Sequence, residues 1–291
     1  MDVSYEESTL GYSPITNKKT NIMNSKRKIL CVGLVCYDIV NVVEYFPVED
    51  TQMRTIEQRR SRGGNASNMT TALSHLNVPC EFMGSLPSES SPDVNFVIED
   101  FRRHNIEHNN CVRHPGYLLP NSCIILNRET GSRTILHTND GLPELTLKDF
   151  SSLSYETYTW VHLEGRPNAI RLADIAKMIK TKCPNLPISL EMEKPTRASK
   201  DELFLVLPFI DLLFISKECA SSLGATSMKE ATSLLKGVLP DNAAIVCPWG
   251  EKGAAGKDTN GEVFEVPCYP PPSGIIARYF LIKQSLTIKI K

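Results

Sequence analysis

Residues 29–36 read ILCVGLVC, and this stretch decides the fold class. It is a continuous apolar run of strand length, which is the pattern of a β-strand buried on both faces in a parallel sheet. The charged residues 26–28 in front of it give it the outline of a secretory signal peptide. That interpretation is disfavoured, because the run is short, Asp38 follows closely and no small-residue cleavage site is evident.

The second half of the chain repeats the buried-strand pattern and alternates it with helical stretches. We predict helices near residues 168–181, 199–207 and 227–237. The predicted strands are TWVHLEG (159–165), ISLEME (188–193), DLLFIS (211–216) and AAIVCPW (243–249). Alternating strands and helices predict an α/β fold, a three-layer α/β/α sandwich around a parallel sheet. Ligands of such sheets bind at the carboxyl ends of the strands.

Two other segments have the alternation of half-exposed strands and predict a small projecting β-sheet at about 40–62 and 118–138. VNVVEYF (40–46) and TQMRTIEQ (51–58) flank a turn, and SCIILNRETGSRTILHT (122–138) reads as a hairpin. Between them, ASNMTTALSHLN (66–77) has helical periodicity and starts after two glycines. Residues 1–27 are polar with little periodicity, so we expect a flexible N-terminal extension.

Composition limits the functional classes. The 291 residues include 32 Lys and Arg against 33 Asp and Glu, a net charge of -1, so no general affinity for nucleic acid or an acidic membrane is expected. The nine cysteines show no C-x-x-C pair and are odd in number. They favour free thiols in a reducing compartment over disulfides or zinc, which predicts a cytoplasmic protein.

Two sites have the chemistry to bind a polyhydroxylated ligand. Asp38 follows the first buried strand, and its carboxylate can accept hydrogen bonds from two sugar hydroxyls, although it could equally serve as a cap or turn former. Gly63 and Gly64 let the backbone approach a ligand just before a helix. Asn65 and Asn68 share one face of its first turn, and their amides both donate and accept. Taken alone, this second motif is also compatible with an ordinary turn and helix cap.

Taken together, these motifs resemble the ribokinase-like, pfkB-type carbohydrate kinase family. The resemblance covers residues 28 to about 272 and is closest to its ketohexokinase branch. The matching segments, in the order that branch shows, are Gly33-x4-Asp38, Arg62-Gly63-Gly64-Asn65-Ala66-x-Asn68, His162-Leu163-Glu164-Gly165-Arg166, Glu191-x-Glu193-Lys194-Pro195 and Trp249-Gly250-Glu251-Lys252-Gly253.

The resemblance implies a role for each matched residue. Asp38, Gly64, Asn65 and Asn68 would hold fructose or a related ketose. Arg133 would lie near the phosphates of ATP, whose Mg²⁺ complex is the implied cofactor. The projecting sheet would act as a lid and as the clasp of a homodimer, in which Asp50 approaches the partner's sugar. The nucleotide would be bordered by Trp249, Gly250, Glu251 and Gly253.

Three competing interpretations of the sequence fail. GEKGAAGK (250–257) differs from a phosphate-binding P-loop in its glycine spacing, and Asp258 stands where Ser or Thr is needed. His104 and His108 are four apart near a helix end without a third metal ligand. No G-x-S-x-G nucleophile motif occurs.

The tail departs from the family pattern. In the family, D-T-x-G-A-G-D follows the proline-rich stretch; its helix N-terminus binds the transferred phosphate, and its last Asp is the general base. Residues 273–291 read SGIIARYFLIKQSLTIKIK and contain no such motif. The resemblance therefore predicts a kinase domain at 28–272 that is truncated at the C-terminus, with a divergent tail at 273–291.

Two classes of function stay open. One is an ATP-dependent kinase that converts fructose to fructose 1-phosphate, impaired by the divergent tail. The other is an inactive chain that acts as a sugar-binding or dimerisation module. Another sugar or nucleoside kinase of the same family is a weaker alternative.

Overall fold

The structure is a computed structural model that describes residues 27–166, 169–193, 202 and 204–269. The predicted N-terminal extension before residue 27 and the divergent tail at 273–291 lie outside these residues. Among the residues described, no helix is both long and apolar enough to cross a membrane.

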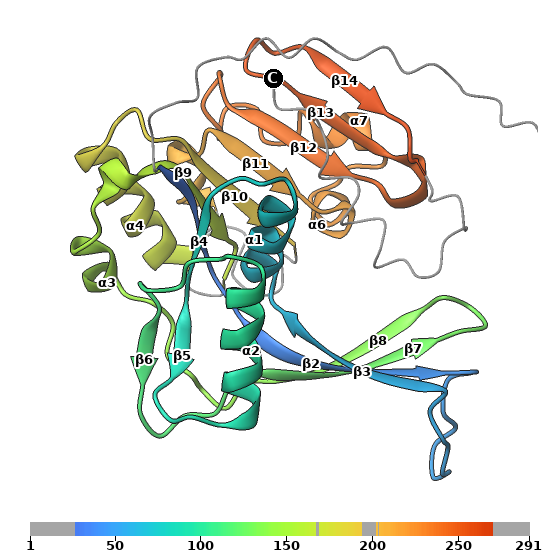
Figure 1. Ribbon diagram of the computed structural model, residues 1–291. Helices are drawn as coiled ribbons and strands as arrows, with labels where there is room; N and C mark the ends of the chain where they lie inside the picture. The colour runs from blue at the N-terminus through green and yellow to red at the C-terminus, as the bar shows by residue number, and fades with distance from the viewer. Residues whose placement is uncertain (1–26, 167–168, 194–201, 203, 270–291) are drawn as a thin grey trace, which may run out of the picture.

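Most of the strands form one large sheet with the order β14-β13-β12-β11-β10-β9-β1-β4 (Figure 1). Neighbours from β4 to β12 pair in parallel, whereas β13 and β14 are antiparallel. The strands are β1 (Lys28–Val32), β4 (Cys80–Met83), β9 (Tyr158–Glu164), β10 (Ile188–Met192), β11 (Leu212–Ile215), β12 (Ala244–Pro248), β13 (Ala254–Lys257) and β14 (Val263–Val266).

Helices cover both faces of this sheet, which confirms the three-layer α/β/α prediction. On one face Ile175 and Ile179 of α4 pack with Leu163 and Leu190 of the strands. On the other face the core includes Ala66 of α1 and Phe101 of α2. The helices are α1 (Asn65–His75), α2 (Pro92–Arg103), α3 (Leu147–Ser151), α4 (Ala169–Lys182), α6 (Lys217–Ser222) and α7 (Met228–Ala231), with 3-10 turns at Tyr155–Thr157, Leu207–Phe209 and Gly250–Lys252.

A second, four-stranded sheet projects from the sandwich, as predicted (Figure 1). Its order is β3-β2-β7-β8, in which β2 and β7 are parallel and the outer pairs antiparallel. The strands are β2 (Cys36–Val43), β3 (Glu57–Gly63), β7 (Asn121–Asn127) and β8 (Arg133–Thr138). The predicted hairpin at 122–138 is therefore confirmed.

The prediction of a single strand over residues 29–36 is wrong. The run divides into β1 of the large sheet and β2 of the small sheet, with the break at Gly33. A Cβ on Gly33 would lie 2.5 Å from Oε2 of Glu164, so only glycine fits where the chain passes this carboxylate. Both halves are buried, and an apolar run therefore cannot reveal that it serves two sheets.

Other predicted boundaries shift for similar reasons. The apolar stretch VPCEFMGSL (78–86), whose pattern predicts one strand, instead contains β4 and the start of β5 (Ser85–Pro87), and β5 pairs with β6 (Val112–His114) in a separate small sheet. The turn between β2 and β3 is longer than expected, because strand structure resumes only at Glu57. The helix predicted at 227–237 is the single turn α7. Of the helix predicted at 199–207, residues 199–201 and 203 lie outside the described residues.

Candidate active site

The site is built around Glu164, the last residue of β9, at the carboxyl end of the large sheet. Its side chain is 3% exposed. Oε2 accepts hydrogen bonds from the backbone N–H groups of Leu34 and Ala66, both at 3.0 Å. Leu34 connects β1 to β2, and Ala66 lies in the first turn of α1. One carboxylate therefore fixes the segment that leads from β1 to β2 and the start of α1.

The second oxygen of Glu164 is held by Arg166, which follows the same strand. Nη1 of Arg166 donates to Oε1 of Glu164 at 3.2 Å, and Nη2 donates to Oε1 of Glu144 at 2.5 Å. Burial lowers the pKa of Arg166, but the two carboxylates outweigh it and raise that pKa overall. The three side chains thus form a buried charge-assisted network, in which each charge is paired.

Gly64 makes the corner from which α1 starts. Its φ of 95° belongs to the region that side chains avoid, and a Cβ there would overlap the carbonyl oxygen of Leu34. A Cβ on Gly63 would overlap the carboxylate of Asp38. The two glycines therefore bring the backbone, Asp38 and the N-terminus of α1 into contact.

Asp38 lies on β2 with its side chain turned to this corner and is 6% exposed. Oδ1 accepts a hydrogen bond from the Cys36 thiol at 3.3 Å. Burial raises the pKa of Asp38, while hydrogen bonding to Ser122 and Cys36 and the charge of His137 oppose the rise. A carboxylate that is desolvated in this way accepts strong hydrogen bonds from a ligand's hydroxyl groups.

Asn65 and Asn68 occupy the first turn of α1 and are both half-buried. The amide of Asn65 donates to Oε1 of Glu191 at 3.2 Å and to Oε2 of Glu193 at 3.1 Å. The amide carbonyl of Asn65 is thereby oriented by the carboxyl end of β10. The structure thus gathers Asp38, Gly64, Asn65 and Asn68 at one corner.

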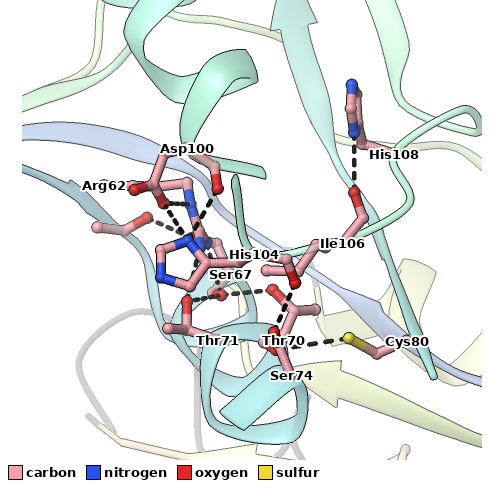
Figure 2. Close-up of polar contacts among 11 residues, drawn as sticks. Arg62, Ser67, Thr70, Thr71, Ser74, Cys80, Asp100, His104, Ile106 and His108 are labelled. Atoms are coloured by element: carbon pink, nitrogen blue, oxygen red, sulfur yellow. Dashed lines mark hydrogen bonds and ion pairs between the residues drawn. The ribbon is translucent and has the colours of Figure 1, made fainter. Parts of the chain in front are cut away.

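Arg62, the last charged residue before this corner, ties α1 to α2 (Figure 2). Its side chain is 2% exposed. The guanidinium donates to Asp100 of α2 at 2.7 Å, to the carbonyl and hydroxyl of Ser67 at 2.7 Å, and to the hydroxyl of Thr71 at 2.6 Å. It also lies 4.3 Å from the ring centroid of Phe101. This network holds the first turns of α1 against α2.

Two of these supporting residues stood in motifs that the sequence analysis quoted but had no assigned role. Glu164 binds backbone atoms that lie far away in the sequence, and Arg62 binds the distant Asp100 as well as the nearby Ser67 and Thr71. The only sequence indication for Glu164 is its place at the carboxyl end of a predicted parallel strand. For Arg62, the sequence indication is the position of a charged residue directly before a glycine pair.

The residues expected to contact the nucleotide are not all brought together. Trp249 follows β12, is 6% exposed and has the Lys217 ammonium 5.6 Å from its ring centroid. Gly250 and Gly253 have positive φ and form the turn into β13. Arg133, however, opens β8 of the small sheet, well apart from β12 (Figure 1). Asp50 is exposed in the loop between β2 and β3.

The histidine pair in the sequence does not form a metal site. His104 Nδ1 lies 2.9 Å from the carbonyl oxygen of Asp100 (Figure 2). The ring of His108 stacks on Phe101. Within the described part of the chain, no cluster of three or more His, Cys, Asp or Glu side chains could hold a metal ion. The nine cysteines are all free, as predicted.

Comparison with known proteins shows the family and the fold of the chain. The profile of the pfkB family carbohydrate kinases matches residues 26–273. Mouse (Mus musculus) ketohexokinase is 37% identical over 253 residues, which are 85% of this chain and 83% of that protein. Ribokinase from Giardia lamblia superposes with a TM-score of 0.70 at 19% identity, over 84% of this chain and 77% of that one. Fructokinase with bound ATP from Xylella fastidiosa superposes with a TM-score of 0.64 at 17% identity, over 83% of this chain and 78% of that one.

Proposed function

The chain belongs to the pfkB family of carbohydrate kinases, which transfer a phosphoryl group from ATP, and from this premise we propose that its sugar site takes fructose or a related ketohexose. The product of the corresponding reaction is fructose 1-phosphate. The observation that carries the proposal is the corner at which Asp38 meets Gly63, Gly64 and the first turn of α1. The 37% identity to a ketohexokinase supports the choice of sugar.

The proposed roles follow from the chemistry of each group. The carboxylate of Asp38 accepts hydrogen bonds from two hydroxyls of the ketose. The backbone at Gly64 approaches the sugar closely because no side chain intervenes. Asn65 and Asn68 donate to and accept from the remaining hydroxyls. Glu164, Arg166 and Arg62 contact protein atoms and keep this corner in place.

Asp38→Asn tests the sugar site directly. We expect fructose affinity to fall about 10- to 100-fold, because hydrogen bonds to a charged group are the strong ones and the amide replaces one acceptor by a donor. Isothermal titration calorimetry with fructose measures this. Asp140→Asn, an exposed aspartate beyond the small sheet, is the matched control. Unchanged affinity in Asp38→Asn would refute the assignment.

For the nucleotide, we propose that Trp249, Gly250, Glu251 and Gly253 border the base or ribose of ATP. Arg133 would reach the phosphates only when the small sheet approaches the sandwich. Mg²⁺ would arrive as the MgATP complex, since this ion prefers phosphate oxygens and water to a cage of protein ligands. It would neutralise charge on the transferred phosphoryl group.

The tail carries the second part of the proposal. Residues 273–291 contain no D-T-x-G-A-G-D, so a polypeptide of these 291 residues would lack the family's general base and the phosphate-binding turn. We propose that its phosphoryl transfer is strongly impaired. This observation favours one alternative function, a chain that binds sugar or dimerises without turnover.

We further propose that the small sheet forms a homodimer, with Asp50 directed to the partner's sugar. Exposed apolar side chains on this sheet and its loop support the proposal, because large apolar side chains rarely gather on the surface of a monomer. They are Tyr45, Phe46, Val48, Ile56, Ile135 and Leu136.

Leu136→Asp on β8 is expected to weaken the dimer at least about tenfold, because it places a charge on an apolar contact. Sedimentation equilibrium measures the shift to monomer. The matched control is Leu76→Asp, which alters an exposed leucine at the end of α1. A wild-type chain that is monomeric at high concentration would contradict the proposed interface.

A further inference from the structure

Glu191 and Glu193, at the carboxyl end of β10, have no part in the sugar and nucleotide contacts proposed above. They are two residues apart, so their side chains point to the same face of the sheet. Met192 between them points to the other face and belongs to the same core as Ile175 of α4. The two carboxylates therefore lie on the face against which α1 packs, and Asn65 is the first residue of that helix.

The two carboxylates use both hydrogens of the Asn65 amide. Nδ2 of Asn65 lies 3.2 Å from Oε1 of Glu191 and 3.1 Å from Oε2 of Glu193. An amide nitrogen has two hydrogens to donate, and an ionised carboxylate only accepts. The flipped amide is ruled out, because its carbonyl oxygen would face two acceptors. Asn65 therefore has no N–H left for a ligand and can offer it only the carbonyl oxygen.

The backbone at the end of β10 is held from both sides. The backbone N–H of Gly165, which follows β9, donates to the carbonyl of Glu191 at 2.8 Å. On the other side, the Ser216 hydroxyl donates to the carbonyl of Glu193. The same hydroxyl accepts a hydrogen bond from the backbone N–H of Cys219 at 3.0 Å and so caps α6. The two carboxylates thus project from a fixed edge of the sheet, which is what precise positioning of a binding group requires.

The N-terminus of α1 attracts negative charge to this place. Gly64 is its N-cap and provides no side-chain cap, and no acidic residue lies in the first turn. Carboxylates reach the helix end from the sheet instead: Glu164 accepts a backbone N–H of the first turn, while Glu191 and Glu193 bind Asn65. The partial positive charge of a helix N-terminus stabilises carboxylates near it. This attraction adds to the hydrogen bonds that hold the amide.

We propose that Glu191 and Glu193 are positioning residues that make Asn65 a hydrogen-bond acceptor, and not a donor, toward the sugar. The inference rests on the proposed binding of a ketose at this corner. Asn65 then has the same acceptor chemistry as Asp38, so the ligand hydroxyl that meets it has to donate. A group that only accepts is rejected at that position, because it leaves the carbonyl oxygen unpaired against another acceptor. The corner thereby selects ligands for donor hydroxyl groups.

The use of both amide hydrogens can be tested without sugar. In nitrogen–proton NMR correlation spectra of the full chain, the side-chain pair of Asn65 is identified by its loss in Asn65→Ala. We expect Glu191→Leu to shift mainly one proton of the pair upfield and Glu193→Leu to shift the other, because each carboxylate accepts from one hydrogen. If neither substitution moves the pair, or if both move the same proton, the inference is wrong.

Calorimetric titration with fructose tests the effect on the ligand. In Glu191→Leu/Glu193→Leu the released amide can turn its N–H₂ toward the sugar, so we expect affinity to fall about three- to tenfold. In Glu191→Gln/Glu193→Gln the amide oxygens can still accept from Asn65, so affinity should stay within about threefold of wild type. The control Glu99→Leu alters an exposed glutamate of α2 and should leave affinity unchanged. Wild-type affinity in the double leucine variant would contradict the proposed positioning.

Ligand selectivity separates positioning from a general loss of stability. Fluorine in place of a hydroxyl cannot donate, so among fructose analogues with one hydroxyl replaced at a time we expect one to bind about tenfold more weakly than fructose. This penalty should be absent in Asn65→Ala, which identifies the hydroxyl that donates to Asn65. In Glu191→Leu/Glu193→Leu it should shrink to less than about threefold, since the released amide can present an N–H to the fluorine.

The outcomes distinguish the inference from the proposed function. A fluorine penalty that is unchanged in the double leucine variant would overturn the inference, as would the lack of any penalty that depends on Asn65. If fructose does not bind to the wild-type chain, but each leucine substitution moves its own proton of the amide pair, the proposed sugar is wrong. The hold of Glu191 and Glu193 on the Asn65 amide would then stand.

Discussion

Replacing residues 273–291 by a D-T-x-G-A-G-D segment with its following helices is expected to raise the rate of fructose phosphorylation by at least about 10⁴-fold. A positioned general base contributes roughly 10²–10⁴ in rate. Donors that stabilise the transferred phosphate contribute about another 10²–10³. Asp38 is a poor substitute for the base, since its proposed task is to bind the sugar.

The measurement compares ATP-dependent phosphorylation of fructose by the 291-residue chain and by the repaired chain. The control is a repaired chain whose last motif Asp is changed to Asn, which keeps the fold and the phosphate-binding turn. We expect this control to lose most of the gain, about 10²–10⁴-fold. Comparable activity in the natural and repaired chains would mean that another residue supplies the base, and the proposed account of the tail would be wrong.

Glu164→Ala is expected to lower the free energy of unfolding by about 3–5 kcal/mol, the range for removing one partner of a buried ion pair. The backbone N–H groups of Leu34 and Ala66 would lose their acceptor, and each buried unsatisfied group costs about 1–3 kcal/mol. Arg166 would keep only Glu144. Glu164→Gln retains an acceptor oxygen and should cost less.

Urea unfolding followed by circular dichroism measures both variants. The matched control is Glu99→Ala, which removes an exposed glutamate 3.8 Å from Arg102 and should cost at most about 1 kcal/mol. If Glu164→Ala and Glu99→Ala unfold at the same urea concentration, Glu164 does not hold the corner together. The fructose affinity of Glu164→Gln then shows whether the geometry of the corner also sets sugar binding.

Local patterns in the sequence were enough for the fold class. Apolar runs such as ISLEME and DLLFIS predict buried strands because a strand covered on both faces has no polar side to show. Turn and helix signals such as Gly63-Gly64-Asn65 act within a few residues, so the start of α1 and the hairpin at 122–138 were also predictable. The same patterns placed Asn65 at the start of a helix, whereas Asp38, predicted to follow the first buried strand, lies within β2 of the small sheet.

What the sequence could not reveal depends on which segments meet. The run at 29–36 serves two sheets, because burial by either sheet produces the same apolar pattern. Glu164 supports the corner through backbone groups more than 90 residues away in the chain. Asp38, Ser122 and His137 share one face of the small sheet only because β2, β7 and β8 pair in one register, and a shift of one residue would turn each side chain to the other face. Sequence determined the elements and the residue types available for binding, and only tertiary pairing decided which of them share a site.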